Sequence, residues 1–390
     1  MRIAYTEAQQ ELLQRLRAVM TELMTPDLVE ELTHNDGGGP LYHQALKRLA
    51  ADGWLGLGWP KEFGGGGATP IEEFLFFDEV HRSGFPIPLL TLNTVGPALM
   101  AHGSEDQKQR FLPAILRGEV HFSIGYTEPS AGTDLASLET RAVRDGDEWV
   151  LNGQKVFISL ASFADYLWCA CRTNPEVSKH KGLSVFIVPM NAPGLEITRI
   201  QNLADADLNA VYLQDVRVPD THLVGPENGG WRLITSQLNH ERVALMMVGP
   251  LVRNARDVRA WAATVPRGSN TLLDQPWVQR NLARVEVGLE VLKLMNWRQA
   301  WNLGRGAIRM EEASAIKVFG SELYIEVNRL LLEVAGAAGA LRRGSPGALL
   351  EGRLERYDRA MRVLTLGGGT NEVQREIIAG AALRLPRHRG

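Results

Sequence analysis

The sequence predicts a mainly helical protein with a β domain in the middle of the chain. Residues 1 to about 117 carry apolar side chains at helical spacing, and from Gly229 onward this spacing returns in longer stretches. Between them, residues 121–226 consist of short β-rich runs divided by turn residues. We therefore expect a helical domain over residues 1–118, a small β domain over 119–227 and an antiparallel helical bundle over 228–390.

The helical stretches of the N-terminal region are interrupted by a glycine-rich segment. Ser104 is a typical N-cap residue before the last of these helices, because its hydroxyl can accept a backbone N–H. The segment GWPKEFGGGGATP lacks the Gly-Lys-Ser/Thr ending of a phosphate-binding loop, so we interpret residues 64–67 as turn residues. The expected N-terminal helices are residues 7–24, 41–53 and 105–118, and those of the C-terminal bundle are 230–249, 277–300, 314–336 and a terminal helix from Asn371.

The β region contains one strong turn signal and both cysteines of the chain. The dipeptide Asn152-Gly153 is typical of a two-residue hairpin turn. Cys169 and Cys171 alternate along one predicted strand, where a disulfide between them is geometrically unfavourable. With no histidine nearby in the sequence, a zinc site is not expected either. We interpret both cysteines as buried thiols that behave as small apolar residues.

The composition excludes several classes of partner. A chain of 390 residues with 45% apolar and 22% charged residues is typical of a globular protein with two or three lobes. A formal charge of −3 gives no electrostatic basis for binding nucleic acid or an anionic membrane. The first 20 residues form a charged amphipathic pattern without the apolar core of a signal peptide, and no stretch approaches the ~18 apolar residues of a membrane span. We therefore expect a cytoplasmic protein without a metal site.

One stretch of the C-terminal region, residues 230–249, carries a carboxylate on its apolar face. That face contains Ile234, Leu238, Leu245 and Val248. Glu241 occupies the remaining position of the stripe. Burial there disfavours the charged form and is expected to raise the pKa of Glu241 toward neutrality, as a general base requires. The alternative is a buried ion pair with Arg242 or with a residue of another helix.

The segment LTLGGGTNEVQR, residues 364–375, places three consecutive glycines directly before the terminal helix. Their backbone N–H groups could bind an anion at the helix N-terminus. Alternatively, the glycines mark a place where side chains are absent to make room. The pattern of residues by itself leaves both interpretations open.

Four motifs together resemble the acyl-CoA dehydrogenase family. These motifs are GYTEPSAGTDLASLET, WVLNGQKVFIS, VRVPDTHLVGPENGGW leading into LNHER, and GGGTNEVQR. The resemblance extends over essentially the whole chain in the same helical–β–helical order. It implies an N-terminal helical domain, a β-barrel-like domain and a C-terminal four-helix bundle. It also implies FAD as cofactor, a CoA thioester as substrate, and oxidation of the Cα–Cβ bond to a trans-enoyl-CoA.

The resemblance assigns cofactor contacts residue by residue. The matching positions are Ile124, Gly125, Tyr126, Thr127, Gly132, Thr133, Phe157, Ser159 and Thr370. The Thr127 hydroxyl matches a position that holds the flavin ring, and Thr133 matches a small hydroxyl residue near the pyrophosphate. Phe157 takes the place of the usual Trp against the ring, and Ser159 that of a Thr near flavin N5. Packing in a β core is the alternative role for Phe157.

The resemblance also answers the question raised by the glycines. In many members the catalytic base is a Glu directly before the Gly-Thr of the terminal motif, and Gly368 occupies that position here. A subset places its base before an Arg on the earlier helix, which corresponds to Glu241 before Arg242. Glu241 is thus expected to take the α-proton as hydride passes to flavin N5, while the Gly368 N–H donates to the thioester oxygen. The expected substrate contacts are Thr133, Arg242, Gly368 and Gly369.

Two departures from the family pattern indicate a partner chain. Homotetrameric members support the adenosine half of a neighbour's FAD with an Arg-x-Thr-Phe-Gly and a Gln-x-x-Gly-Gly-x-Gly segment. Here the first region reads ATVPRGSNTLLDQ, and the second has Glu333 in place of the Gln. We therefore expect a homologous second subunit, an α2β2 assembly and one FAD per unlike pair. The alternative is a homotetramer in which Arg267 and Ser269 substitute.

The resemblance is strongest to bacterial dehydrogenases of sterol side-chain degradation. It implies a bulky polycyclic acyl-CoA, with branched fatty and aryl acyl-CoA as alternatives. An electron-transfer flavoprotein is the expected electron acceptor, whereas direct reaction with oxygen would make the chain an oxidase. A different class of function also stays open: a non-catalytic subunit that completes the flavin site of its partner.

Overall fold

The computed structural model describes residues 4–34, 37–244, 246–307 and 309–386, and the side chains of His34 and of residues 238–244 lie outside this description. The chain divides into two compact units. One comprises residues 25–68 and 86–241, and the other comprises residues 1–24, 69–85 and 242–390. None of the helices in the described part has the length and the apolar run that a bilayer crossing requires.

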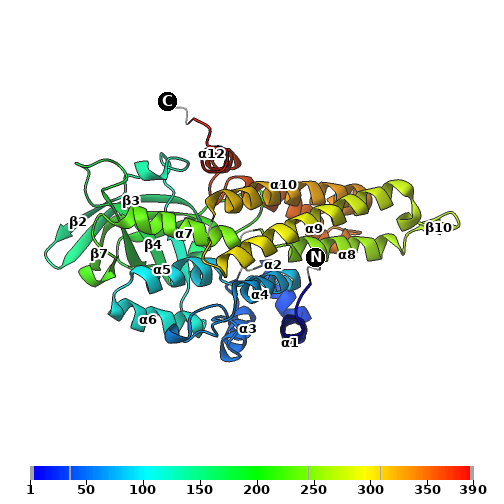
Figure 1. Ribbon diagram of the computed structural model, residues 1–390, viewed down its shortest axis with the longest axis horizontal. Helices are drawn as coiled ribbons and strands as arrows, with labels where there is room; N and C mark the ends of the chain where they lie inside the picture. The colour runs from blue at the N-terminus through cyan, green and yellow to red at the C-terminus, as the bar shows by residue number, and fades with distance from the viewer. Residues whose placement is uncertain (1–3, 35–36, 245, 308, 387–390) are drawn as a thin grey trace. The chain divides into compact units, whose positions relative to one another are not determined.

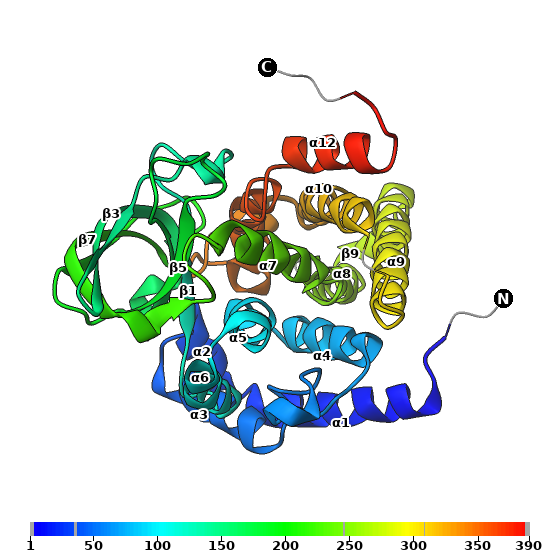
Figure 2. The same cartoon turned by 60° about the vertical axis from the view of Figure 1, so that its left-hand side comes forward.

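The first unit is built around the β region of the sequence. Its strands are β1 (Phe122–Gly125), β2 (Arg141–Asp145), β3 (Glu148–Ser159), β4 (Tyr166–Arg172), β5 (Leu183–Pro189), β6 (Leu195–Arg199), β7 (Leu208–Pro219) and β8 (Leu223–Val224). They form one sheet in the order β6-β7-β3-β2-β4-β5-β8, and β1 pairs in parallel with β4. Figure 2 shows β3, β5 and β7 curving around a common interior. Trp149, Leu151 and Phe186 are among the side chains that fill this core.

The hairpin prediction at Asn152-Gly153 is wrong, because both residues lie inside β3. The hairpin between β2 and β3 instead turns at Gly146, which has a left-handed φ of 66°. The pairing of β3 with β7 changes register between Leu151 and Gly153. A Cβ atom at Gly153 would lie 2.5 Å from the Thr140 hydroxyl, so the glycine permits a bulge and a close approach.

The cysteine prediction is confirmed, since Cys169 and Cys171 are free and fully buried on β4. Helices complete this unit before and after the sheet. They are α2 (Pro26–His34), α3 (Pro40–Ala51), α5 (Gly96–His102), α6 (Glu105–Leu116) and α7 (Gly230–Ala244), with a π-helical turn at Thr91–Val95. Ser104 caps α6 as expected, its hydroxyl accepting the Gln107 N–H at 3.2 Å. The glycine-rich segment at residues 64–67 is a loop, as expected.

The second unit is a helical assembly. Its helices are α1 (Glu7–Leu23), α4 (Pro70–Ser83), α8 (Gly249–Ala262), α9 (Pro276–Leu303), α10 (Met310–Ala335), α11 (Arg353–Ala360) and α12 (Asn371–Ala381). The long helices α9 and α10 run side by side, with α8 against them (Figure 1). Val258, Val278 and Val327, one from each of these helices, are completely buried in the core that they share.

The expected helix over residues 230–249 is two helices. Helix α7 ends at Ala244, and α8 begins at Gly249 with Pro250 in its first turn. Proline lacks a backbone N–H and disfavours a helical residue before it, so the helix cannot run through this point. Val248 is therefore the N-cap of α8 and does not share a helical face with Ile234.

Candidate active site

The loop after β1 is held by a buried ion pair. The Lys155 ammonium on β3 lies 2.7 Å from the Glu128 carboxylate, and both side chains are almost completely buried. Glu128 also accepts backbone N–H groups from Glu139 at 2.6 Å and from Thr140 at 2.9 Å. Burial acts to raise the pKa of Glu128, but the Lys155 charge and these hydrogen bonds outweigh it and lower the pKa.

This ion pair positions the predicted flavin loop. Lys155 also donates to the Tyr126 carbonyl at 3.4 Å, and the Val156 N–H donates to the Thr127 carbonyl at 2.9 Å. A tight turn follows, in which Glu128 and Ala131 exchange two backbone hydrogen bonds of 3.1 Å. The predicted cofactor residues Ile124, Gly125, Tyr126 and Thr127 therefore lie beside β3, and Gly132 and Thr133 follow on the exposed side of the turn.

Phe157 and Ser159 lie at the end of β3, where the strand is irregular. The register of β3 against β7 shifts between Lys155 and Ile158, and Phe157 has a left-handed φ of 59°. This bulge turns the Phe157 side chain outward, so that 60% of the residue is exposed. A left-handed backbone at a bulky residue is strained and is typical of functional positions. The alternative role of Phe157 as a core residue is wrong.

An exposed aromatic ring beside an exposed hydroxyl fits the flavin ring that the sequence predicts. Ser159 is exposed, and its carbonyl accepts the Ser123 hydroxyl at 3.0 Å, which ties the end of β3 to β1. The ring of Phe157 offers a flat apolar face, and the Ser159 hydroxyl is free to point outward. Backbone contacts thus join the loop after β1 and the end of β3, the two segments that carry the predicted flavin-ring residues of the first unit.

A buried polar network links the flavin loop to α7. The Tyr126 hydroxyl donates to the Gln237 side-chain carbonyl, and the Trp168 indole N–H lies 3.1 Å from the same hydroxyl. The Gln237 amide donates to the Thr94 carbonyl of the π-helical turn at 3.3 Å. Gln237 is 3% exposed and lies one helical turn before Glu241. This network has no signature in the sequence, because nothing in the local pattern pairs residues 126, 168 and 237.

Glu241 and Arg242 lie within the helical span of α7, but their side chains fall outside the described residues. The buried face of α7 begins with Leu233, Ile234 and Gln237. Position 241 continues this face, because residues four apart on a helix lie one above the other. The position of residue 241 on this face of the backbone therefore does not depend on Val248.

The glycine motif lies in the second unit, before α12. Gly368 and Gly369 both have left-handed backbones, with φ of 67° and 89°. The Gly368 carbonyl accepts the Gln374 amide at 3.1 Å, and in the described part of the chain its N–H has no partner. Thr370 caps α12 by accepting the Val373 N–H. Glycine is thus needed here for backbone conformation, and the motif presents a free donor.

A buried lysine anchors this motif, and sequence reasoning missed it. Lys317 on α10 is completely buried and donates to the Asn371 side-chain carbonyl at 2.8 Å. Ser321 also bonds Asn371 at 3.0 to 3.1 Å. Asn371 is the first residue of α12, directly after the glycines and Thr370. In the sequence, the sign of this anchor is a lysine within an apolar helical stripe.

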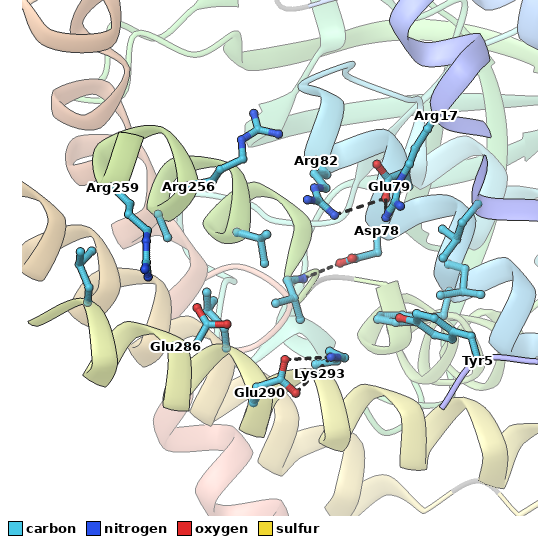
Figure 3. A pocket seen from close by; sticks show the side chains of 18 residues that line it. Tyr5, Arg17, Asp78, Glu79, Arg82, Arg256, Arg259, Glu286, Glu290 and Lys293 are labelled. Atoms are coloured by element: carbon cyan, nitrogen blue, oxygen red, sulfur yellow. Dashed lines mark hydrogen bonds and ion pairs between the residues drawn. The ribbon is translucent and has the colours of Figure 1, made fainter. Parts of the chain in front are cut away.

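A charged cavity of about 380 Å³ lies in the second unit among α1, α4, α8 and α9 (Figure 3). Four of its charged side chains pair with one another: Arg17 with Glu79 at 2.9 Å, and Lys293 with Glu290 at 2.8 Å. Asp78 caps α8 by accepting the Val248 and Gly249 N–H groups at 2.7 and 2.8 Å. None of the predicted site residues lines this cavity, and its pairings indicate a structural role.

The two segments expected to differ from homotetrameric family members are also described. Glu333 at the end of α10 pairs with Arg329 and accepts the Asn281 amide at 2.9 Å. Arg267 and Ser269 belong to a short exposed hairpin of β9 (Pro266–Arg267) and β10 (Asn270–Thr271). The charge of the Glu333 carboxylate is therefore balanced by Arg329 of the same chain. The contacts with Arg329 and Asn281 hold this carboxylate between α9 and α10.

Three family models match nearly the whole chain. The acyl-CoA dehydrogenase N-terminal domain matches residues 6–119, the middle domain residues 123–216, and the C-terminal domain residues 228–383. The fold classification from the sequence is therefore confirmed: a helical N-terminal region, a middle sheet domain and a helical C-terminal region.

Individual proteins are similar over their full length. The chain is 52% identical to acyl-CoA dehydrogenase FadE26 of Mycobacterium tuberculosis, covering 99% of each sequence. A chain in the crystal structure of the ChsE4-ChsE5 complex from Mycobacterium tuberculosis is 52% identical, with a TM-score of 0.93 and 100% coverage of both chains. A chain of the Tcur3481-Tcur3483 steroid ACAD is 47% identical, with a TM-score of 0.94 and 100% coverage of both chains.

Proposed function

Because the chain belongs to the acyl-CoA dehydrogenase family, we propose that it oxidises the Cα–Cβ bond of a bulky steroid side-chain acyl-CoA, with Glu241 as the base. The family assignment makes the chain a FAD-dependent oxidoreductase. The steroid substrate is supported by the likeness to a complex described as a steroid ACAD. Branched fatty and aryl acyl-CoA esters are the alternative substrates.

One observation carries the assignment of the base: the hydrogen bond between Tyr126 and Gln237. It joins the predicted flavin loop to the turn of α7 that precedes Glu241. Because helical residues four apart lie on one face, position 241 lies on the face of α7 that carries Gln237. Gly368 has no side chain to serve as base, so Glu241 is the remaining candidate from the family pattern.

The chain's own residues then have distinct roles. Glu241 removes the proton from Cα of the thioester, and Arg242 orients that carboxylate. The free Gly368 N–H donates to the thioester oxygen and stabilises the enolate charge that develops there. Phe157 would cover the cofactor ring, and Ser159 would donate a hydrogen bond to it. The bound flavin supplies the acceptor for the hydride that leaves Cβ.

The substitution Glu241→Gln tests this proposal. It replaces the base by a neutral amide of the same shape, so we expect flavin to bind normally and substrate-dependent bleaching to slow by at least about 10³-fold. Exchange of the α-proton with deuterated solvent should also be lost. Glu376→Gln, an exposed substitution on α12, is the control. Bleaching at the normal rate in Glu241→Gln would remove Glu241 as the base and revive the non-catalytic subunit as an alternative.

We also propose that the chain works with a homologous second subunit in an α2β2 assembly. Two observations support this. Glu333 has a carboxylate in place of the amide that homotetrameric members offer to a neighbour's cofactor. This carboxylate is bonded to Arg329 and Asn281 of its own chain. Helix α9 exposes Val287, Val291, Leu294 and Trp301 along one face, beside a groove of about 550 Å³ against α10. Such an apolar face is typical of a subunit interface.

Light scattering and flavin content test the assembly. Co-expression with a homologous chain encoded nearby should give a heterotetramer with one FAD per unlike pair, and Val287→Glu should dissociate it. Arg280→Glu, on the same helix at the edge of the groove, is the control for a charge change there. A chain that purified alone as a fully active yellow homotetramer would overturn the proposal. Oxygen consumption in the same assays would distinguish an oxidase from a dehydrogenase that needs an electron-transfer flavoprotein.

A further inference from the structure

Phe157 is followed by a second strained residue at the end of β3. Leu160, three positions later, has the same left-handed φ of 59°. A left-handed backbone at a bulky residue is unfavourable and persists only where the surrounding structure holds it. Neither residue belongs to the regular pairing of β3 with β7, which is irregular between Lys155 and Ile158 and ends at Ser159. The conformation of residues 157–160 therefore depends on other contacts.

Two residues at the start of β7 supply these contacts. The Leu160 N–H donates to the Asp207 carbonyl at 3.2 Å, and the Asn209 amide donates to the Ile158 carbonyl at 3.4 Å. Asp207 is 6% exposed, and Asn209 is completely buried. The two backbone groups that are bonded here belong to the peptide units on either side of Ser159. The position of Ser159 is therefore fixed from both directions.

The Asp207 carboxylate extends this restraint to the turn after β3. One of its oxygens accepts the Ser162 N–H at 3.3 Å and the Asn209 amide at 2.8 Å. The other oxygen accepts the Ser162 hydroxyl at 2.8 Å. This hydroxyl also lies 3.2 Å from the Asn209 side-chain carbonyl. Ser162 belongs to the short 3-10 helix Ala161–Phe163, so the network joins the start of β7 to the turn that follows residues 157–160.

The hydrogen bonds of this network do not require the charge of Asp207. A carboxylate only accepts hydrogen bonds, whereas a hydroxyl both donates and accepts. An asparagine at position 207 would keep the oxygen that receives the Ser162 N–H and the Asn209 amide. Its own NH2 group would donate to the Ser162 hydroxyl, and that hydroxyl would turn its proton to the Asn209 carbonyl 3.2 Å away. Substitution by asparagine therefore separates the geometry of the network from its charge.

We propose that Asp207 and Asn209 are positioning residues, which hold residues 157–160 in the shape that receives the edge of the flavin. Asp207 acts through the geometry of its hydrogen bonds and not through its charge. Because these bonds fix the segment within the protein itself, FAD binding does not have to order it, and the affinity for FAD is higher for that reason. This inference rests on the proposed flavin contacts of Phe157 and Ser159 and adds the residues that prepare them.

The test compares FAD binding in wild type, Asp207→Ala and Asp207→Asn, each as the full-length holoenzyme with any co-purifying subunit. Flavin fluorescence on dilution gives the Kd of FAD. Asp207→Ala should raise this Kd about tenfold, because the segment must then be ordered on binding. Asp207→Asn should stay within about twofold of the wild type, because it keeps the hydrogen bonds.

Asp220→Ala is the matched control. Asp207 directly precedes β7, and Asp220 directly follows it. The Asp220 carboxylate accepts the Trp149 indole N–H at 2.8 Å near the start of β3, at the end of the strand remote from Ser159. This control removes a comparable carboxylate from the same pair of strands, so the Kd of FAD should change by less than about twofold.

Hydrogen exchange of the holoenzyme gives a second readout that a general loss of stability would not produce at one place. The amides of Leu160 and Ser162 should exchange at least about tenfold faster in Asp207→Ala than in Asp220→Ala. Ser162→Ala removes the hydroxyl but keeps the backbone N–H bond to Asp207. This milder variant should raise the Kd of FAD about 2- to 5-fold, and it tests the network if Asp207→Ala does not fold.

The outcomes separate this inference from the proposed function. Unchanged FAD affinity and exchange in Asp207→Ala would overturn the positioning role while the proposed dehydrogenation stands. Equal losses in Asp207→Ala and Asp220→Ala would also overturn it, since any weakening of the sheet would then suffice. A loss in Asp207→Asn as large as in Asp207→Ala would overturn the geometric account. Weaker FAD binding in Asp207→Ala, in an enzyme whose flavin no acyl-CoA bleaches, would overturn the proposed dehydrogenation and leave the positioning role in place.

Discussion

Among the described residues, each of the two units contains one completely buried lysine, and each lysine anchors a loop that carries predicted site residues. In the first unit, Lys155 holds the flavin loop through the Glu128 carboxylate and the Tyr126 carbonyl. In the second unit, Lys317 holds the start of α12, after the glycine motif, through the neutral side chain of Asn371. The two anchors have the same cation and the same burial, but Glu128 and Asn371, the side chains that accept these hydrogen bonds, differ in charge.

This difference teaches how strongly each loop is held. A buried cation with a carboxylate partner depends on that partner, because removing it leaves an uncompensated charge in a medium of low dielectric. A neutral amide contributes a hydrogen bond of more modest strength. We therefore expect the flavin loop to be the more sensitive of the two loops to loss of its anchor.

The largest expected effect comes from removing the two partners. Glu128→Ala should lower the free energy of unfolding by about 3–5 kcal/mol and release flavin, because Lys155 loses its buried carboxylate. Asn371→Ala should lower it by about 1–3 kcal/mol, because Lys317 loses a neutral acceptor. Urea unfolding followed by circular dichroism measures both.

Exposed substitutions next to each anchor serve as controls. Glu139→Ala leaves its backbone bond to Glu128 intact, and Glu376→Ala lies on the exposed side of α12. The free energy of unfolding of both variants should stay within about 0.5 kcal/mol of the wild-type value. If Asn371→Ala proved as costly as Glu128→Ala, the charge of the partner would not be what distinguishes the two loops.

The second expected effect is a contrast in pH dependence between buried carboxylates. Asp78 forms no ion pair in the part of the chain that the structure describes, and burial raises its pKa to about 6 despite the two backbone N–H groups it accepts. Because this pKa lies above that of the unfolded state, the contribution is fully present below about pH 3.9 and is lost as the pH rises through 6. Between pH 5 and pH 8, the titration of Asp78 should lower the free energy of unfolding of the wild type by about 1.5 kcal/mol. Asp78→Asn should abolish this decrease.

The contribution of Glu128 to stability has the opposite pH dependence. Its pKa is lowered, so its contribution is present above the unfolded value of about 4.3 and is lost as the pH falls through the folded value. Denaturant unfolding at a series of pH values measures both slopes. If the free energies of unfolding of the wild type and of Asp78→Asn changed in parallel from pH 5 to pH 8, Asp78 would not titrate as its burial indicates.

The smallest expected effect concerns the strained residue of the first unit. Phe157→Gly relieves a left-handed φ at an exposed position, so the apoprotein should gain up to about 1 kcal/mol in the free energy of unfolding. The same change removes the apolar cover of the cofactor ring, so FAD affinity should fall about tenfold. Phe157→Tyr keeps the ring and should change neither quantity. Equal FAD affinity in Phe157→Gly would exclude a contact between Phe157 and the flavin.

Local patterns were sufficient for the order of helices and strands, for Ser104 as an N-cap and for the buried cysteines. Local patterns gave a wrong prediction where one sequence signal is compatible with two structures. Asn152-Gly153 is favourable in a hairpin turn, but pairing of β3 with β7 placed it in a bulge. The helical spacing of apolar residues also continues from Ile234 to Val248, although α7 ends at Ala244 and α8 begins at Gly249 with Pro250 in its first turn.

The sequence by itself determined the family and the helical–β–helical order, and it supplied the prediction of Glu241 in place of position 368, because these depend on residue types and spacing along the chain. Only the tertiary structure decided that Phe157 turns outward, that Gln237 bonds Tyr126, and that Lys155 and Lys317 have partners of different charge. These contacts join residues up to 111 positions apart. Burial and pairing across such distances depend on how strands and helices pack, which spacing along one segment does not encode.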